Sequence, residues 1–398
     1  MDPENFKHIL ISDFGSFGKP RAYRNWTLPL MGNTVLNDGP HHRVIRALIK
    51  PVFSRAETYS NRLDFFANKF LDLLPPKGTS FNITPFCKRL FLDFSTDFIF
   101  GHSINSLGDE ENAREFIDAF KKALHYFGKR RDAGWVGFTY AWNRDYIQAC
   151  KIVHNFIDEQ VAKALLETKK MTVTSESYTV IEELAKHIKD PIELRSQVLG
   201  IFIPAVDTPS GALLHTLFEL ARQPHRWHRL RQIALSAEEP LSFRQLRSAE
   251  FAEIRHVVLE TLRIYTLMGL RYAVRDCVLP RGGGKDQDQP MFVAKGTKFY
   301  IVLTAWHREP SIWGEDAEKY RPERWKDHEQ RGDLEFIPFI AGFRRCPAAD
   351  TVPVQTAYLL VKLLQKYEGI KNEDPEEQYY EQWGMTLESR NGVRISFE

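Results

Sequence analysis

The segment from Arg195 to Ala221 constrains the fold most, because its first half is almost entirely apolar. A helix that is hydrophobic on all sides is buried, either in the core of a large protein or in a membrane. The longest apolar run, Val198 to Val206, is much shorter than the roughly 18 residues needed to cross a membrane. The sequence therefore predicts a long helix through the interior of a soluble protein, with other elements packed around it.

Helical periodicity dominates the first two thirds of the chain, and a different pattern follows. The predicted helices are 43–53, 56–74, 109–124, 145–166, 195–221 and 250–265. After about residue 270 we expect strands over 271–279 and 298–303, a turn at Arg281-Gly-Gly-Gly, a long loop over 315–345 and an apolar helix over 351–367. The prediction is a mainly α fold with a small β-rich subdomain, in one domain over 1–398 that is helix-rich over 1–269 and β-rich over 270–398.

Charge and cysteine content exclude several classes of protein. The 54 Lys and Arg residues nearly balance the 52 Asp and Glu residues, so net charge does not indicate nucleic acid as a partner. Cys87, Cys150, Cys277 and Cys346 lie far apart and include no CxxC pair, which is typical of a reducing compartment rather than a disulfide scaffold. The polar first residues do not form a signal peptide.

One cysteine lies in a segment whose neighbours suggest chemistry: Phe339-Ile-Ala-Gly342-Phe-Arg344-Arg-Cys346-Pro-Ala348. A thiol on a loop just before an apolar helix can ionise, because the helix N-terminus stabilises the negative sulfur. Gly342 permits a tight turn close to a flat ligand, and Arg344 can reach an anionic group on it. Phe339 can shield the sulfur from water. Taken alone, Cys346 has an alternative interpretation as a buried structural thiol.

This segment resembles the haem-ligand signature of the cytochrome P-450 family, Phe-x-x-Gly-x-Arg-x-Cys, with Ala348 where the family usually has glycine. Glu260-Thr-Leu-Arg263 resembles the family's Glu-x-x-Arg helix motif, although this spacing is also common on solvated helices. Pro322-Glu-Arg324-Trp325 resembles its Pro-Glu-Arg-Phe segment. The resemblance implies that Cys346 is the axial ligand of the iron in a haem b (iron protoporphyrin IX). It also implies that Glu260, Arg263 and Arg324 form a buried structural triad.

Arginines that would bind the haem propionates are implied by the same resemblance. His42-Arg43-Val-Ile-Arg46 is similar to the family's helix carrying Trp-x-x-x-Arg, with His42 in place of the tryptophan, and Arg271 matches a second propionate-binding arginine. The alternative is that Arg43, Arg46 and Lys50 form a solvated basic helix face. The predicted cofactor-binding residues are His42, Arg46, Arg271, Phe339, Gly342, Arg344, Cys346 and Ala348.

The segment Pro204-Ala-Val-Asp-Thr-Pro209 stands where the family has Ala-Gly-x-Asp/Glu-Thr-Thr, on a helix that crosses above the haem. The resemblance thus places the haem between this long helix and the helix after the cysteine loop. Thr208 would hydrogen-bond at the oxygen site, and Asp207 would help relay protons. Pro209 has no N–H for the carbonyl of Ala205, which could then bind a water, and it disfavours helical geometry at Thr208. The alternative is that one helix ends here and Thr208 caps another that begins at Pro209.

The resemblance implies a monooxygenase that inserts one oxygen atom of O2 into a hydrophobic substrate and reduces the other to water. The segment beginning Leu279-Pro-Arg-Gly most resembles fungal alkane and fatty-acid hydroxylases, whose branch also serves secondary metabolism. Two alternatives stay open: a redox-neutral haem-thiolate isomerase, dehydratase or cyclase, and a haem-binding protein without turnover. The chain has no flavin or nicotinamide fingerprint, so we expect electrons from an NADPH-dependent flavoprotein reductase. On this chain, the surface that docks the reductase would be formed by the basic residues Arg43, Lys50, Arg55 and Arg345.

Location and assembly follow from the same comparison. The first residues resemble a segment well inside fungal members of the family, which carry a membrane anchor, a hinge and the first strands before it. Full-length relatives are expected at the cytosolic face of the endoplasmic reticulum membrane. This chain, without the anchor, is expected to be a soluble cytosolic monomer with no nucleic-acid partner.

Overall fold

The computed structural model describes residues 2–19, 27–34, 36, 38, 40–54, 60–169, 179–266, 268–326, 334–383 and 386–398. The chain forms two compact units. The smaller, called unit 1, comprises Met1–Tyr23 and His256–Asp350, and the larger, unit 2, comprises Arg24–Arg255 and Thr351–Glu398. Within the described residues the fold is mainly α with small antiparallel sheets, which confirms the predicted fold class.

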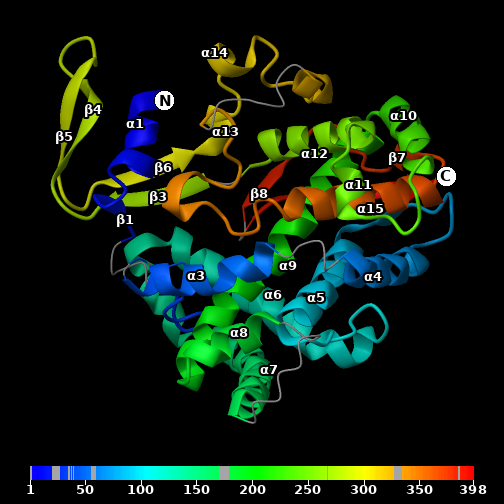
Figure 1. Ribbon diagram of the computed structural model, residues 1–398, viewed down its shortest axis with the longest axis horizontal. Coiled ribbons are helices and arrows are strands. Elements are labelled where there is room, and N and C mark those ends of the chain that lie inside the picture. Colours follow the sequence, from blue (N-terminus) through cyan, green and yellow to red (C-terminus); the bar gives the residue numbers. More distant parts are fainter. Residues whose placement is uncertain are drawn as a thin grey trace. The chain divides into compact units, whose positions relative to one another are not determined.

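Unit 2 is built from helices that surround α9 (Figure 1). Its helices are α3 (Pro40–Ser54), α4 (Ser60–Leu73), α5 (Thr84–Phe100), α6 (Glu110–Asp132), α7 (Arg144–Lys169), α8 (Val180–His187), α9 (Pro191–Ala221), α10 (Pro224–Leu235), α11 (Phe243–Leu246) and α15 (Val352–Lys366), with the short 3-10 segments Gly134–Trp142 and Ala249–Phe251. Each helix predicted for this part of the chain is present, with bounds shifted by a few residues.

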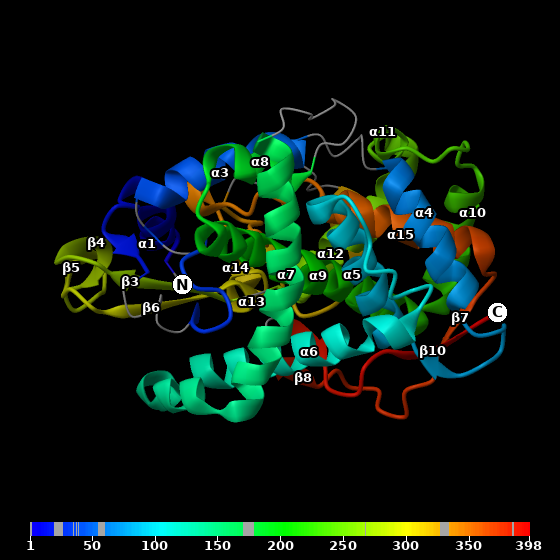
Figure 2. The same cartoon turned by 90° about the horizontal axis from the view of Figure 1, so that it is seen from below.

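Helix α9 is the central element of unit 2, as its apolar composition predicts. Asp190 caps it, accepting a hydrogen bond from the backbone N–H of Glu193 at 2.7 Å. Helices α5, α7, α8, α10 and α15 pack against it (Figure 2). By length and composition α9 is the one described helix that could cross a membrane, but 83% of its apolar window is buried inside the protein. It is therefore a core helix.

Two small antiparallel sheets complete unit 2. The first has the strand order β2 (Phe81–Asn82), β10 (Arg394–Phe397) and β7 (Ile370–Asn372). The second pairs β8 (Glu381–Trp383) with β9 (Leu387–Ser389), with Glu381 opposite Ser389. Strand β9 contacts α9. Residues close to the C-terminus thus lie beside the central helix.

Unit 1 joins the N-terminal residues to the β-rich part of the chain. Its helical elements are α1 (Pro3–Lys7), a π-helical turn (His8–Ser12), α12 (Ala252–Ile264, whose first four residues belong to unit 2), α13 (Leu303–Trp306), α14 (Pro310–Trp313) and the 3-10 turns Pro322–Lys326 and Gly342–Arg344. One sheet has the order β1 (Phe17–Gly18), β3 (Met268–Ala273) and β6 (Lys298–Val302), and β4 (Cys277–Gly283) pairs with β5 (Gln289–Val293). The ring of Phe6 stacks on Trp306 at 5.0 Å in its core.

The predicted turn at Arg281-Gly-Gly-Gly is wrong in position. Strand β4 continues through Gly283, which pairs with Gln289 of β5, so the reversal lies over 284–288. The prediction missed β5 altogether. Glycines are a common turn signal, but Gly282 adopts a φ of +115° inside the irregular ladder.

Candidate functional site

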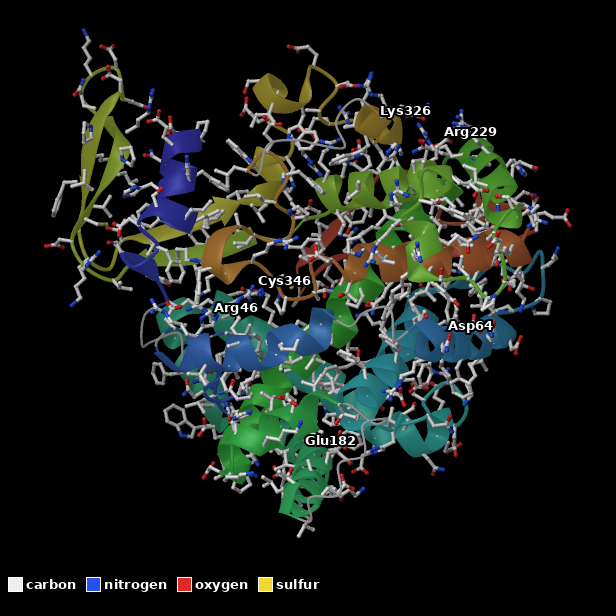
Figure 3. All side chains as sticks on the ribbon, viewed as in Figure 1. Arg46, Asp64, Glu182, Arg229, Lys326 and Cys346 are labelled. Atoms are coloured by element: carbon white, nitrogen blue, oxygen red, sulfur yellow. The ribbon has the colours of Figure 1, made fainter. Side chains whose placement is uncertain are left out.

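The loop that carries Cys346 lies in unit 1 and leads into α15 (Figure 3). The backbone N–H of Cys346 donates to the carbonyl of Phe339 at 2.9 Å. The N–H of Arg345 donates to the carbonyl of Gly342 at 3.0 Å, inside the 3-10 turn. These two bonds close the segment from Phe339 to Cys346 on itself. The cysteine is therefore held by backbone geometry rather than by a regular element.

Glycine at position 342 is required by the local structure. Its φ is +69°, a region that L side chains rarely adopt, and an added Cβ would stand 2.3 Å from the carbonyl oxygen of Leu10. Ile340, two residues earlier, also has a positive φ of 60°. The close approach that demands Gly342 is thus to the backbone of the π-helical turn His8–Ser12. Its predicted approach to a ligand remains a prediction.

Burial separates Cys346 from two of the other cysteines. Cys87 and Cys150 are fully buried, and burial raises the pKa of the Cys87 thiol far above its usual range and that of Cys150 to about 12. Cys277, on β4, is partly exposed, and burial together with Asp13 raises its thiol pKa. Cys346 is also partly exposed. Of the four thiols, those of Cys277 and Cys346 are therefore the ones that solvent reaches.

The two arginines that unit 1 contributes to the predicted clamp lie on different elements. Arg271 is on β3, with only 6% of its surface exposed, and its Nη1 donates to the carbonyl of Leu270 at 2.8 Å. Arg344 is half-buried on the 3-10 turn, and its guanidinium lies 5.8 Å from the ring centre of Phe14. A buried guanidinium needs an anionic or polar partner, because desolvation of a charge is costly. Phe339 and Ala348 are half-buried in the same loop.

Glu260, Arg263 and Arg324 form the network that the motifs predict. Arg263 makes two bonds to the Glu260 carboxylate, at 2.8 and 2.9 Å, and the Nε of Arg324 donates to it at 3.0 Å. The indole N–H of Trp325 and the backbone N–H of Arg321 also donate to Glu260. All three charged side chains are buried. The predicted structural triad is confirmed in its geometry.

Helix α9 continues through both prolines, so the alternative of a helix end at Thr208 is wrong. Pro209 does leave the carbonyl of Ala205 without its helical donor, as predicted, but a side chain takes that place. The hydroxyl of Ser95, on α5, donates to the Ala205 carbonyl at 3.0 Å. Thr208 donates its own hydroxyl to the carbonyl of Pro204 at 2.7 Å. The helix therefore tolerates Pro209 because a tertiary bond replaces the missing one.

Asp207 is nearly buried in the same turn of α9 and belongs to a charged cluster. Its Oδ1 lies 3.9 Å from Nζ of Lys88, on α5, and that ammonium lies 2.7 Å from Oε1 of Glu388, on β9. Burial raises the pKa of the Asp207 carboxyl to about 6, Lys88 acts to lower it and Glu388 acts to raise it. A carboxyl with this pKa can both take up and release a proton near neutrality.

The remaining predicted residues lie on α3 in unit 2. His42 is 5% exposed, and Arg46 is half-buried one turn later (Figure 3). Arg43 and Lys50 are exposed on the same helix. Arg55 lies outside the described residues. Of the three residues in the alternative of a solvated basic face, Arg43 and Lys50 are exposed and Arg46 is half-buried, so the role of Arg46 stays a prediction.

The residues present fit a prosthetic group that brings its own metal. No cluster of three or more His, Cys, Asp or Glu that could hold a metal ion occurs within the described ranges. A partly exposed thiol on a loop closed by backbone hydrogen bonds, with a buried and a half-buried arginine in the same unit, instead suits one axial ligand and an anionic cofactor. Cys346, Arg271 and Arg344 are the residues of unit 1 that would hold it.

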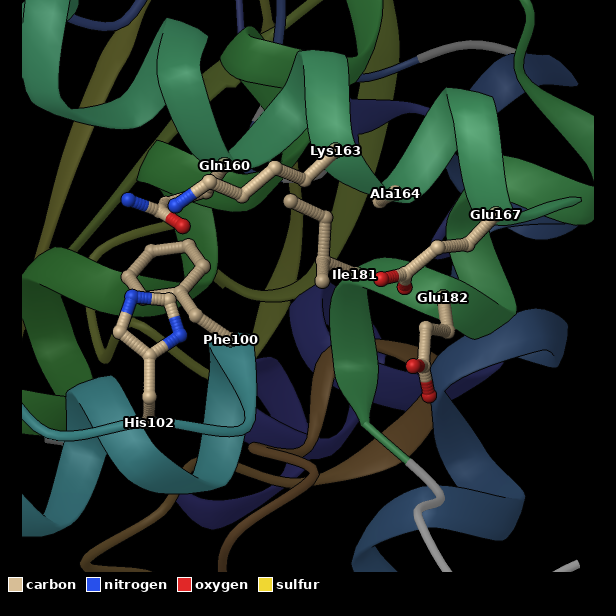
Figure 4. A pocket seen from close by; sticks show the side chains of 8 residues that line it. All are labelled: Phe100, His102, Gln160, Lys163, Ala164, Glu167, Ile181 and Glu182. Atoms are coloured by element: carbon tan, nitrogen blue, oxygen red, sulfur yellow. The ribbon is translucent and has the colours of Figure 1, made fainter. Parts of the chain in front are cut away.

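A small surface cleft in unit 2 does not belong to this site. It has a volume of about 150 Å³ and is lined by residues of α7, α8 and the end of α5, among them Phe100, Gln160, Lys163 and Glu182 (Figure 4). Ligand sites for drug-sized molecules usually measure about 300–1,000 Å³. The cleft is too small for a cofactor of haem size.

The chain is similar to known proteins over nearly its whole length. The family model described as Cytochrome P450 matches residues 1–394. A protein named cytochrome P450 monooxygenase tenA, from Beauveria bassiana, is 34% identical over 413 residues, covering 100% of this chain and 80% of the relative. Cytochrome P450 52A10 from Candida maltosa is 32% identical, covering 93% and 75%. Cytochrome P450 monooxygenase apdE from Emericella nidulans is 34% identical, covering 94% and 74%.

Proposed function

The chain belongs to the cytochrome P450 family of monooxygenases, and from that premise we propose that it oxidises a hydrophobic substrate: a fatty acid, an alkane or a fungal secondary metabolite. The similarity to fungal proteins named as cytochrome P450 monooxygenases supports the oxidation, and the resemblance of the segment beginning Leu279-Pro-Arg-Gly to alkane and fatty-acid hydroxylases supports the range of substrates. We propose haem b as the cofactor. The single observation that carries the proposal is the loop holding Cys346, whose signature residues and closed backbone fit an axial thiolate.

In this proposal Cys346 supplies the thiolate, and Arg271 and Arg344 bind the propionates, together with His42 and Arg46 from α3. Haem, when bound, supplies the activation of O2, and electron donation from a thiolate ligand favours O–O cleavage. Phe339 limits the access of water to the sulfur. Ala348 keeps the small side chain that the signature needs, and Gly342 keeps the turn that sets the position of the thiol.

Thr208 and Asp207 are proposed to deliver protons. The hydroxyl of Thr208 uses its hydrogen on the carbonyl of Pro204, but both of its oxygen lone pairs remain able to accept. Asp207 is nearly buried, and burial raises its carboxyl pKa to about 6, so it can hold a proton and pass it inward. The two residues are adjacent on α9, and Ser95 keeps this part of the helix intact beside Pro209.

The test is Thr208→Ala in the haem-loaded protein with a substrate and a reductase. We expect substrate binding to persist, while NADPH consumption yields hydrogen peroxide in place of product. Thr216→Ala is the matched control. The Thr216 hydroxyl, like that of Thr208, donates to the backbone carbonyl four residues earlier, here that of Ala212 at 2.8 Å, and Thr216 is fully buried. Unchanged product per NADPH in Thr208→Ala would refute the proton-delivery role. Product formed without any reductant would instead support the redox-neutral alternative.

Electrons are proposed to come from an NADPH-dependent flavoprotein reductase, with the protein acting as a monomer. Arg43 and Lys50 of α3 are exposed, as is Arg345, which pairs with Asp350 at 2.8 Å. Exposed basic groups steer an acidic partner through long-range attraction, which salt screens. Reduction by a reductase should therefore slow as ionic strength rises, and Arg43→Glu with Lys50→Glu should slow it further without changing substrate affinity.

A further inference from the structure

Three charged side chains from distant parts of the chain meet beside the middle of α9. Lys88 comes from α5, Asp207 from α9 and Glu388 from β9, close to the C-terminus. Strand β9 passes α9 at Gly211, where an added Cβ would lie 3.9 Å from the carbonyl oxygen of Leu387, an ordinary van der Waals distance. The approach of β9 brings Glu388 within reach of Lys88.

The two carboxylates do not share the ammonium equally. Nζ of Lys88 donates a hydrogen bond to Glu388 at 2.7 Å, whereas Asp207 is 3.9 Å away, which is electrostatic contact without a hydrogen bond. The side chains of Lys88 and Glu388 are 27% and 28% exposed, but that of Asp207 is only 9% exposed. The buried carboxyl group of Asp207 thus interacts less strongly with Lys88, the cation of this cluster, than Glu388 does.

Several other charged groups on the elements that pack against α9 have partners of their own. Asp93 of α5 accepts from the N–H groups of Ser106 and Leu107, and His215 of α9 bonds the hydroxyl of Tyr379 at 2.7 Å. The ion pairs on these elements include Arg89 with Glu110, Asp97 with Arg62, Asp158 with Arg195, Lys186 with Glu183, Arg229 with Glu253, Lys362 with Asp64, Lys366 with Asp72 and Lys371 with Glu398. Lys88 and Glu388 are the side chains that act on the ionisation of Asp207.

We propose that Glu388 is a positioning residue for Asp207: by holding the Lys88 ammonium, it prevents a full ion pair between Lys88 and Asp207 and so leaves Asp207 able to exchange its proton. Burial of Asp207 favours its neutral form, and a close ammonium would favour its ionised form. Without Glu388, the ammonium would be free to approach Asp207, which would then stay ionised to lower pH. The strand near the C-terminus thereby controls the acid on the central helix.

The consequence for turnover rests on the proposed function of Asp207, but the ionisation does not. If Asp207 delivers protons in its protonated form, delivery declines as pH rises through its pKa. Lowering that pKa moves the decline to lower pH. Glu388 touches neither the substrate nor the cofactor in this account. It acts on Asp207 by holding Lys88 and through its own negative charge.

The test measures the ionisation of Asp207 directly. The haem-loaded protein is labelled with 13C at aspartate side chains and titrated by NMR in its diamagnetic ferrous–CO state, and the signal absent from Asp207→Asn assigns the residue. Glu388→Gln should lower the midpoint of Asp207 by about one pH unit, a tenfold increase in its acid dissociation constant. Lys88→Gln should raise the midpoint. Glu381→Gln is the matched control, since it removes the same charge from the paired strand β8 and should leave the midpoint unchanged.

An unchanged Asp207 midpoint in Glu388→Gln, with Lys88→Gln raising it, would overturn the proposal. A lowered midpoint in Glu388→Gln supports the proposal whatever happens to turnover, and a raised one would also overturn it. The second readout is the pH dependence of product per NADPH. If the midpoint falls in Glu388→Gln but this profile does not move, the positioning role stands and the proton-delivery role of Asp207 is refuted.

Discussion

Replacing Ser95 by alanine removes the hydroxyl that substitutes for the missing N–H of Pro209. Ser95 is 2% exposed and Ala205 is partly buried, and the variant leaves the carbonyl of Ala205 without this donor. Leaving a fully buried acceptor unsatisfied costs about 1–3 kcal/mol, and a partly buried one costs less because water can reach it. We therefore expect Ser95→Ala to lower the free energy of unfolding by about 1.5 kcal/mol. The loss should depend on Pro209, because a residue with an N–H at that position can donate to Ala205 itself.

The assay is a double-mutant cycle in urea, with haem-loaded protein followed by far-UV circular dichroism. In a Pro209→Ala background, the cost of Ser95→Ala should fall below about 1 kcal/mol, the size expected for an ordinary lost hydrogen bond. Ser210→Ala is a control, because its hydroxyl donates to Asp207 within α9 and does not involve Ala205. Equal costs of Ser95→Ala with and without Pro209 would refute the reasoning that the two residues compensate each other.

Three further predictions concern the rest of the molecule. Glu260→Gln leaves the buried guanidinium groups of Arg263 and Arg324 without their counter-charge, so it should lower the free energy of unfolding by about 3–5 kcal/mol. Glu253→Gln, which breaks the exposed pair with Arg229, should lower it by less than about 1 kcal/mol. Arg271→Ala or Arg344→Ala should weaken haem binding by about 2–5 kcal/mol, measured as haem transfer to apomyoglobin, and retention equal to the parent in both variants would contradict the clamp. Burial lowers the pKa of His307 to about 3, so between pH 6.5 and 3 the unfolded state binds a proton that the folded state does not. The contribution of His307 to the free energy of unfolding should therefore fall by about 1.4 kcal/mol per pH unit as the solution is acidified through that range. His307→Gln, which can still accept from Ile337, should make the acid side of the stability profile flatter, and an identical slope would count against this assignment.

Elements with strong local signals could be predicted from the sequence. The apolar segment 195–221 is the core of α9, and the helix expected over 145–166 lies within α7. Asp109 was expected to open a helix, and it caps α6 by accepting from the N–H of Asn112. The turn at Arg281 was misplaced because glycines inside a strand ladder give the same signal as glycines in a turn. The local sequence pattern does not distinguish a glycine within a strand from a glycine in a turn.

The uninterrupted course of α9 could not be predicted. Pro209 disfavours helical geometry at the preceding residue, and the sequence around it offers a helix cap at Thr208. The bond that offsets this cost comes from Ser95, more than a hundred residues earlier. The contact between Lys88 and Glu388 could not be predicted for the same reason, because a lysine and a glutamate 300 positions apart form no sequence pattern. A local signature identifies Cys346 in the sequence, whereas contacts between residues far apart in the chain become visible only in the folded structure.

The ferrous–CO absorption spectrum tests the central claim, that Cys346 is the axial thiolate, most directly. The parent protein should show the band of a thiolate-ligated haem, and Cys346→Ser should lose it. Cys277→Ser is the matched control, because Cys277 is also partly exposed and lies in unit 1, and it should keep the band. A thiolate-type band that survives in Cys346→Ser would contradict the account.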